Sequence, residues 1–322
     1  MTEQHPSAPP AGQVMSFRES LLGWWEGNAR ELPWRKTRDP YRILVSEVML
    51  QQTQVDRVIP YYHQWLQAFP DVHALAAAPT ATVIRLWKGL GYNRRAVNLQ
   101  RAAAAVVERG GQFPDTVVEL RALPGIGPYT AGAIACFAFE QDVSFIDTNM
   151  RRVLHRVFVG SDVPERRASD REILGIAQAA LPDGDAWRWN QALIEFGALQ
   201  CTARTPACVI CPAQTVCMAR PRIHSDLQAA NADRNGRSRA PVPFERTNRY
   251  FRGRIIDALR EQDGGALSIE ALGRMVKPDY SIEDQAWLQK LVVDLERDGL
   301  AVIAEDEPEY DAGEKPIRVS LP

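Results

Sequence analysis

The chain has 322 residues, of which 45% are hydrophobic and 24% charged, the composition of an ordinary globular protein with two or three domains. No apolar run reaches the roughly 18–20 residues that a membrane-spanning helix needs, which argues against an integral membrane protein. The net charge of −2 hides an asymmetry: Asn248 and the residues after it include 16 acidic and 10 basic residues, against 24 and 28 before it. The N-terminal part is therefore the candidate for contact with phosphate groups.

The first residues, MTEQHPSAPPAG, are polar and rich in Pro and Ala. They lack the basic start and the apolar core of a secretory signal. We therefore expect residues 1–14 to form a disordered tail and the protein to be cytoplasmic.

Residues 15–218 show apolar positions every three or four residues, the pattern of helices that bury one face. Gly and Pro residues separate the periodic stretches. This part is predicted to be an all-α domain. Its clearest helical stretches are residues 47–69, with Pro60 as a break, and residues 81–90, 94–110 and 130–139.

Residues 219–247 are polar and weakly periodic, which is typical of a linker. Residues 248–322 follow another pattern, with three predicted helices and two short predicted strands. This is the order of a winged helix-turn-helix, and a small α+β domain without a nucleic-acid role is the alternative. The predicted elements are residues 249–262, 267–275, 282–300, 301–306 and 316–322.

Four of the five cysteines crowd into one short stretch with the spacing C-x6-C-x2-C-x5-C: Cys201, Cys208, Cys211 and Cys217. Zinc sites usually pair two CxxC knuckles, and only one is present here. The spacing therefore favours a 4Fe–4S cluster, with zinc as the alternative. The fifth, Cys136, lies in an apolar stretch and is expected in the core.

The string LPGIGPYTAGAI spans residues 123–134. Gly125 and Gly127 permit a tight turn, and Thr130 lies near the start of the helix that follows. Backbone N–H groups at such a start can bind a phosphate, although a short GxG also occurs in ordinary helix–helix turns.

Two carboxylates are candidates for acid–base chemistry. Asp147 precedes a helical stretch, where an aspartate is more often an N-cap. Glu47 interrupts an apolar stretch, VSEVMLQQTQV, and its residue type alone favours the exposed side of a helix.

Several longer strings carry a family resemblance. LPGIGPYTA resembles the helix-hairpin-helix signature of the DNA glycosylase superfamily, and the cysteine spacing with its lead-in WNQALIEFGALQC resembles that of endonuclease III and MutY-type glycosylases. SEVMLQQTQV, LPWRKTRDPY and GLGYNRRAVNL resemble the MutY-type adenine DNA glycosylases in particular. The resemblance implies the helix-hairpin-helix glycosylase fold and a 4Fe–4S cluster on the four cysteines.

The resemblance also implies a chemistry. Glu47 protonates the adenine at N7, Asp147 stabilises the cationic sugar, and Asn149 helps to orient the site. The two carboxylates would face each other across an extruded nucleotide. Tyr129 occupies the position at which bifunctional members carry a Schiff-base lysine, so the enzyme is expected to be monofunctional.

Other positions are implied to contact DNA: Leu32, Trp34, Arg35 and Gln191 near the adenine pocket, Gln51, Gln52 and Tyr92 in the duplex, and Gly125, Gly127 and Thr130 on the backbone. The expected partner is double-stranded DNA that contains a mispaired or damaged base, bound by a monomer associated with the nucleoid.

Three departures from the family pattern keep alternatives open. Residues 147–149 read D-T-N, which resembles thymine mismatch glycosylases and endonuclease III, and Tyr92 is followed by Asn93 rather than by a second tyrosine. Residues 248–322 are too short for the MutT-like domain of many relatives. A thymine or uracil mismatch glycosylase acting opposite guanine is one alternative. A non-catalytic iron–sulfur regulator that binds DNA through the winged helix is the other.

Overall fold

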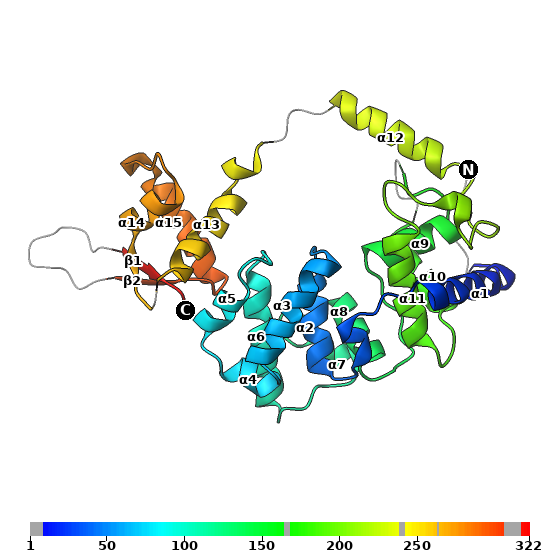
Figure 1. Cartoon of the computed structure of the whole chain (residues 1–322), viewed down its shortest axis with the longest axis horizontal. Coiled ribbons are helices and arrows are strands. Elements are labelled where there is room, and N and C mark those ends of the chain that lie inside the picture. Colours follow the sequence, from blue (N-terminus) through cyan, green and yellow to red (C-terminus); the bar gives the residue numbers. More distant parts are fainter. Residues whose placement is uncertain (1–8, 164–167, 238–241, 263, 306–316) are drawn as a thin grey trace, which may run out of the picture. The chain divides into compact units, whose positions relative to one another are not determined.

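A computed structural model describes residues 9–163, 168–237, 242–262, 264–305 and 317–322, and helices dominate it (Figure 1). The chain divides into two compact units. The first consists of Met1–Ile43, Pro114–Ala122 and Ile126–Arg239, and the second of Leu44–Phe113, Leu123–Gly125 and Ala240–Pro322. Among the described residues, no helix is long and apolar enough to cross a membrane.

The first unit is helical and has an aromatic core. Helix α1 packs against α11, which also packs against α9. Phe17 of α1 is fully buried and meets the rings of Phe158, Trp189 and Phe196 edge to face, at 5.5, 5.7 and 6.4 Å between ring centres. Edge-to-face packing of this kind adds to the hydrophobic burial. The elements are α1 (Ala11–Asn28), η1 (Pro33–Lys36), α7 (Val117–Arg121), α8 (Pro128–Phe137), α9 (Thr148–Phe158), α10 (Asp170–Ala180), α11 (Ala186–Leu199), η2 (Cys208–Ile210) and α12 (Ile223–Arg237).

Helix α1 begins inside the segment that the sequence predicts to be a disordered tail. The side-chain amide of Gln13 donates hydrogen bonds to the backbone oxygens of Val157 at 3.1 Å and Val216 at 2.8 Å, and Val14 is buried. These contacts order the first turn of the helix. The predicted tail therefore does not extend to residue 14, and residues 1–8 lie outside the described part of the chain.

Part of the segment that the sequence predicts to be a linker is also helical. The first turns of α12 pack into a small cluster, in which Ile223 and Leu227 meet Val163, Cys208 and Cys217. Ile223 and Leu227 are buried, whereas residues 228–233 are polar residues or alanines, of which all but Ala230 are exposed. That is why its periodicity is weak in the sequence.

The second unit contains the next helices and the C-terminal region. Helix α6 packs against α4 and α5. Trp65 of α3 meets Phe69 and Trp87 edge to face in the core. The helices before the C-terminal region are α2 (Pro40–Leu50), which begins in the first unit, α3 (Val55–Ala68), α4 (Val72–Ala77), α5 (Thr80–Leu86) and α6 (Arg94–Glu108).

The helix break predicted at Pro60 is wrong. Pro60 lies inside α3, and the break falls at residues 51–54, where Gln52 adopts a φ of 57°. A proline removes only one intrahelical hydrogen bond, and α3 buries Val58, Tyr62 and Trp65 along one face. That apolar face keeps the helix continuous through the proline.

The C-terminal region has the predicted winged-helix-like order of three helices followed by two strands. One further strand of two residues, too short to leave an alternating pattern, completes an antiparallel sheet in the order β1-β3-β2. The all-α prediction for residues 15–218 and the winged-helix-like prediction are both confirmed over the described residues. The elements are η3 (Phe244–Arg246), α13 (Asn248–Arg260), β1 (Leu267–Ser268), α14 (Ile269–Val276), η4 (Ile282–Asp284), α15 (Gln285–Arg297), β2 (Val302–Glu305) and β3 (Ile317–Ser320).

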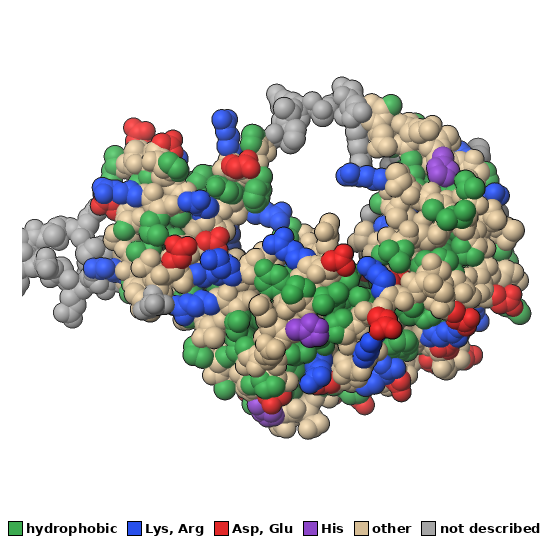
Figure 2. All heavy atoms as spheres, viewed as in Figure 1, with side chains coloured by type: hydrophobic (Ala, Val, Ile, Leu, Met, Phe, Trp, Pro, Cys, Tyr) green, Lys and Arg blue, Asp and Glu red, His purple; other side chains and the backbone are tan. Residues whose placement is uncertain are grey.

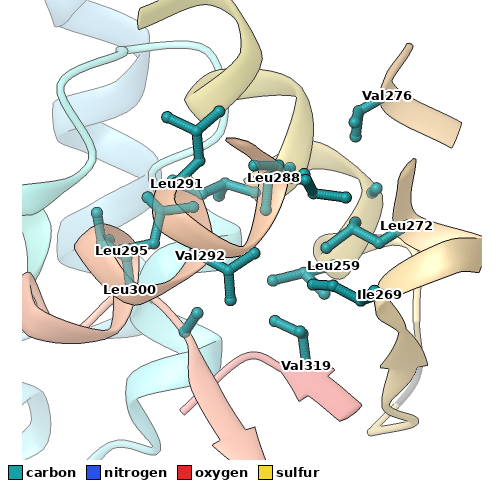
Figure 3. Close-up of a cluster of buried hydrophobic side chains, with 14 of the residues drawn as sticks. Leu259, Ile269, Leu272, Val276, Leu288, Leu291, Val292, Leu295, Leu300 and Val319 are labelled. Atoms are coloured by element: carbon teal, nitrogen blue, oxygen red, sulfur yellow. The ribbon is translucent and has the colours of Figure 1, made fainter. Parts of the chain in front are cut away.

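The core of this region is continuous with the helices before it. Figure 3 shows Leu259, Leu272 and Leu288 directed towards the same interior as Val319 of the sheet. Ile84 of α5 and Val97 of α6 belong to the same buried cluster. The C-terminal region is therefore packed on α5 and α6 rather than joined to them only by the chain.

Candidate functional site

The turn before α8 has the backbone conformation that the LPGIG string predicts. Gly125 has a φ of 76°, and a Cβ there would lie 2.7 Å from the Cβ of Asn98, so a side chain would be both strained and crowded. Gly127 is the N-cap of α8 without a capping side chain, and Pro128 follows it. The first turn of α8 therefore relies on backbone N–H groups that no side chain caps, which is the arrangement that binds anions. Thr130 is buried.

Asp147 is the N-cap of α9. Its Oδ1 accepts a hydrogen bond from the backbone N–H of Met150 at 2.6 Å, and its Oδ2 accepts one from the side-chain amide of Asn149 at 3.3 Å. Burial raises the pKa of Asp147, while these hydrogen bonds and the charge of Arg152 oppose the rise. The carboxylate is thus poorly solvated and held in one orientation, so its capping role and a chemical role are compatible.

Arg152 connects Asn149 to the cysteine-rich segment. Its guanidinium donates hydrogen bonds to Asn149 Oδ1 at 2.7 Å, to the backbone oxygen of Gly197 at 2.6 Å and to that of Cys201 at 2.8 Å. A Cβ on Gly197 would lie 2.7 Å from the Cβ of Asn149, so α11 approaches α9 closely here. Arg152 is not among the residues predicted from the sequence, although its position three residues after Asn149 places both on one helical face.

Tyr129 lies on the first turn of α8 and contacts the segment that leads to Asp147. Its ring meets that of Phe145 edge to face, with 5.5 Å between the ring centres. Phe145 is buried against Gly132, where an added Cβ would lie 2.6 Å away. The contact ties the start of α8 to the chain just before α9.

A buried polar network joins the LPWRK string to α11. Arg35 donates through Nε to Gln191 Oε1 at 2.8 Å and through Nη2 to Glu195 Oε2 at 3.0 Å, and its guanidinium lies over the ring of Trp25. Burial acts to raise the pKa of Glu195, but the hydrogen bonds from Arg30 and Arg35 outweigh it and hold that pKa below its usual value.

The network brings two of the predicted pocket residues, Arg35 and Gln191, into direct contact. The other two, Leu32 and Trp34, are also buried, and both are close to Arg35 in the sequence. Sequence reasoning missed Glu195, and the available signal was an acidic residue four positions after Gln191, inside the apolar run ALIEFGAL.

Glu47 lies in the part of α2 that belongs to the second unit. The glutamate is only 6% exposed, and its neighbours Ser46, Val48 and Met49 are buried as well. The alternative that placed Glu47 on the exposed side of the helix is wrong. A carboxylate is rarely buried without a specific role or partner, which keeps Glu47 as a functional candidate.

Arg95 holds together the two loops that carry Gln52 and Tyr92. Its guanidinium donates to the backbone oxygens of Gln51 at 2.6 Å and Gly91 at 3.1 Å, among other acceptors, and lies over the ring of Tyr92. Burial lowers the pKa of Arg95 to about 10. Sequence reasoning missed this residue, whose contacts span 44 positions of the chain.

Gln52 and Tyr92 share an unusual backbone conformation, with φ values of 57° and 47°. Glu140 is the other described residue besides glycine with a positive φ. Both Gln52 and Tyr92 are exposed. Strained backbone at exposed polar and aromatic residues is characteristic of ligand-contacting loops.

The four cysteines of the predicted cluster site line one small cavity, together with Arg156 and Phe196 of α11. Burial raises the pKa of all four thiols, and the charge of Arg156 lowers the pKa of Cys201. Arg156 also contacts Cys201 Sγ at 3.6 Å. Among the described residues, no three His, Cys, Asp or Glu side chains are arranged to hold a metal ion. The donor set nevertheless suits an iron–sulfur cluster, because four cysteines of one segment line the same cavity beside the cation of Arg156.

Comparison with known proteins identifies the family. Residues 45–178 match the HhH-GPD superfamily of base excision DNA repair proteins. The chain is 41% identical over 244 residues to the adenine DNA glycosylase of Mycolicibacterium smegmatis, a match that covers 75% of this chain and 79% of that protein. This chain belongs to the adenine DNA glycosylase family within the HhH-GPD superfamily.

Two further comparisons, one of sequence and one of structure, agree with this family. The human adenine DNA glycosylase is 42% identical over 235 residues, which cover 70% of this chain and 43% of the human protein. The chain therefore matches less than half the length of its mammalian relatives. A thermostable thymine-DNA glycosylase superposes with a TM-score of 0.61 at 29% identity, covering 66% of this chain and 98% of that one. The predicted helix-hairpin-helix glycosylase fold is thus confirmed.

Proposed function

We propose that the protein is a monofunctional DNA glycosylase of base excision repair, which hydrolyses the N-glycosidic bond of adenine mispaired with 8-oxoguanine or guanine. The observation that carries this proposal is the 41% identity to an adenine DNA glycosylase over 79% of that protein's length. Both candidate carboxylates, Glu47 and Asp147, lie within the superfamily match at residues 45–178.

The chemistry divides between the two carboxylates. Departure of the base leaves negative charge on the adenine and positive charge on the sugar, so the reaction needs a proton donor and an anion. Glu47 donates the proton to the adenine at N7. Asp147 remains ionised and stabilises the sugar cation, in the orientation that Met150 and Asn149 give it.

Strand cleavage is not part of the proposed activity. A lyase of this superfamily needs an amine that attacks the sugar and forms a Schiff base. Tyr129 stands at that position, and a phenol cannot form one. The ring shapes the site instead, through its packing on Phe145.

DNA contact is assigned to three groups of residues. Gly125, Gly127 and Thr130 form the turn that binds a backbone phosphate. Gln51, Gln52 and Tyr92 enter the duplex, and Leu32, Trp34, Arg35 and Gln191 surround the extruded adenine. Flipping a base costs a few kcal/mol, which such contacts offset. The partner is double-stranded DNA with a mispaired or damaged base, bound by a monomer in the cytoplasm near the nucleoid.

A 4Fe–4S cluster on Cys201, Cys208, Cys211 and Cys217 completes the proposal. When bound, the cluster would cross-link residues 201–217 through four iron–sulfur bonds. Arg156 lies where its charge offsets that of the thiolates, and its hydrogen bonds to Thr202 at 2.7 Å and Ala203 at 3.2 Å hold the loop backbone.

The test is single-turnover base release from four duplexes that contain A:8-oxoguanine, A:G, T:G or U:G. We expect release of adenine from the first two, without strand cleavage. Asp147→Asn should abolish it. Release of thymine or uracil in place of adenine would overturn the substrate assignment, and an active Asp147→Asn variant would overturn the catalytic one.

A further inference from the structure

A groove with a volume of about 620 Å³ lies in the second unit, between the start of α6 and the start of α13. One wall carries Tyr92 and Arg94, which follow the GLG string, and the other carries Phe244, Arg249 and Arg252 of the C-terminal region. Of these residues, only Tyr92 is assigned a DNA contact in the proposed function. The residues of the C-terminal wall are assigned none.

The groove is basic although the C-terminal region as a whole is acidic. Five arginines and two aspartates line it, against 16 acidic and 10 basic residues from Asn248 onward. Figure 2 shows several Lys and Arg side chains over the C-terminal region, with Asp and Glu side chains among them. A local concentration of arginine on an otherwise acidic domain favours an anionic ligand at this place. The charged residues are Arg94, Arg95, Arg249, Arg252, Arg254, Asp257 and Asp298.

Exposed aromatic rings lie beside the arginines. The guanidinium of Arg249 lies 4.2 Å from the ring centre of Tyr92 and 5.9 Å from that of Phe244. Tyr92 is 41% exposed and Phe244 54% exposed. Arg249 itself makes no ion pair within the described residues, whereas Arg94 and Arg252 share Asp298. Arginine and aromatic side chains together bind both parts of a nucleotide, the phosphate and the base.

The wall that carries Arg249 is held in place by buried contacts. Arg260, at the end of α13, donates to the backbone oxygen of Ile84 at 3.1 and 2.9 Å and to Asn93 Oδ1 at 2.9 Å. Arg252, also on α13, donates a hydrogen bond through Nη2 to Asp298 Oδ2 at 2.6 Å. The two walls are therefore presented together, and a ligand would meet a preorganised site.

We propose that this groove binds a strand of the DNA substrate, with a base against the rings of Tyr92 and Phe244 and a phosphate on Arg249. The inference rests on the proposed function for the identity of the nucleic acid. It makes the C-terminal region a part of the substrate-binding surface. The exposed aromatic side chains favour a DNA strand over an acidic peptide, because a peptide of that kind would need only the charges of the arginines.

The test is equilibrium binding of the full chain to a labelled mismatched duplex, measured by fluorescence anisotropy over a range of salt concentrations. We expect Phe244→Ala to weaken binding about tenfold, the effect of losing one stacked base. Arg249→Ala should weaken binding to a similar extent, because it removes the phosphate contact. Arg249→Ala should also make log K depend less steeply on log[salt], by about the amount that one phosphate contact contributes. Arg249→Lys should restore that salt dependence but not the full affinity. Arg274→Ala is the matched control, because Arg274 is exposed, lies on α14 and pairs with Glu270.

Photo-crosslinking supplies a direct readout. With benzoylphenylalanine in place of Phe244, the protein should crosslink to a strand of the duplex. Binding by Arg249→Ala and Phe244→Ala equal to that of Arg274→Ala, or no crosslink, would overturn the groove proposal while wild-type adenine release continued. Absence of adenine release by the wild type would instead overturn the proposed function.

Discussion

Arg152 donates a hydrogen bond to the side-chain oxygen of Asn149 at 2.7 Å. Asn149 in turn donates to Asp147, and Arg152 reaches the backbone oxygen of Cys201. One chain of hydrogen bonds therefore runs from the candidate catalytic carboxylate to the first candidate cluster ligand. The positions of Asn149 and Cys201 are coupled through a single guanidinium.

Arg152→Ala should slow adenine release because Asn149 and the loop backbone lose their common donor. We expect the rate of adenine release to fall about tenfold to a hundredfold, which is the usual effect of a small displacement of a catalytic group from its productive position. Single-turnover kinetics measure it. Arg151→Ala serves as the control, because Arg151 donates instead to the backbone oxygen of Ala168 at 2.9 Å. Equal rates for the two variants would contradict the coupling.

Asp147→Asn should abolish adenine release without loss of thermal stability. Burial raises the pKa of Asp147 above its unfolded value, so its contribution to stability is full below the unfolded pKa and is lost as the pH rises through the folded pKa. At neutral pH the ionised carboxylate therefore costs stability, and asparagine removes that cost while remaining a good N-cap.

Melting temperatures of the wild type and Asp147→Asn over a range of pH check this prediction. The Tm of the variant should equal or exceed that of the wild type near neutral pH, and the difference should shrink as the pH falls towards the pKa of the folded carboxyl. The acid limb of the wild-type rate profile should lie at a higher pH than an ordinary aspartate would give. A marked drop in Tm for the variant at neutral pH would contradict the prediction that the buried carboxylate costs stability.

Tyr129→Lys should introduce strand cleavage. A lysine at this position supplies the amine that attacks the sugar, so reduction with borohydride should trap a covalent complex with DNA. Loss of the ring contact with Phe145 costs about 0.5–1.5 kcal/mol of packing. Tyr129→Phe keeps that contact and should give no trapped complex. A trapped complex with the wild type would show that another amine performs this chemistry.

Cys211→Ser should lower the iron content of the purified protein and its thermal stability together, because four thiolates hold one cluster. Iron analysis and the visible absorbance of the cluster measure the loss. Cys136 provides the control, since its side chain is fully buried and lies outside the cavity of the four cysteines. Cys136→Ala should keep its iron, and an iron-free wild type that holds zinc would favour the alternative metal.

Local features of the fold and of the site are readable from the sequence. The helices of residues 15–218 follow their apolar periodicity, the cysteines share one loop by their spacing, and Asp147 caps the helix that follows it. Each of these depends on residues that are close together in the chain, where spacing alone dictates geometry.

Contacts between distant segments leave no such trace. Arg35 and Gln191 are 156 positions apart, and Arg95 reaches across 44 positions to the turn after α2. The helix break predicted at Pro60 is wrong for the same reason: packing decides it. The apolar face of α3 is buried, and this burial outweighs the local preference of proline to end a helix. The roles of Arg95, Arg152 and Glu195 become visible only when the fold brings their partners to them.

Arg260→Met should loosen the C-terminal region from α5. The arginine side chain is 5% exposed and satisfies the backbone oxygen of Ile84 as well as Asn93 Oδ1. Burial lowers its pKa, and the hydrogen bond and charge of Asp257 oppose that shift. Methionine keeps the apolar stem but leaves the acceptors without a donor, which costs about 1–3 kcal/mol.

Denaturant unfolding and amide hydrogen exchange of residues 248–322 measure this loss. Arg297→Met is the matched control, since Arg297 is 76% exposed and pairs with Asp294 on the helix surface, so its change should stay within about 0.5 kcal/mol. Because Arg249 lies on the same helix as Arg260, the loosened variant should also bind duplex DNA more weakly than Arg297→Met. Equal stability and equal binding in the two variants would show that Arg260 does not hold α13 against α5.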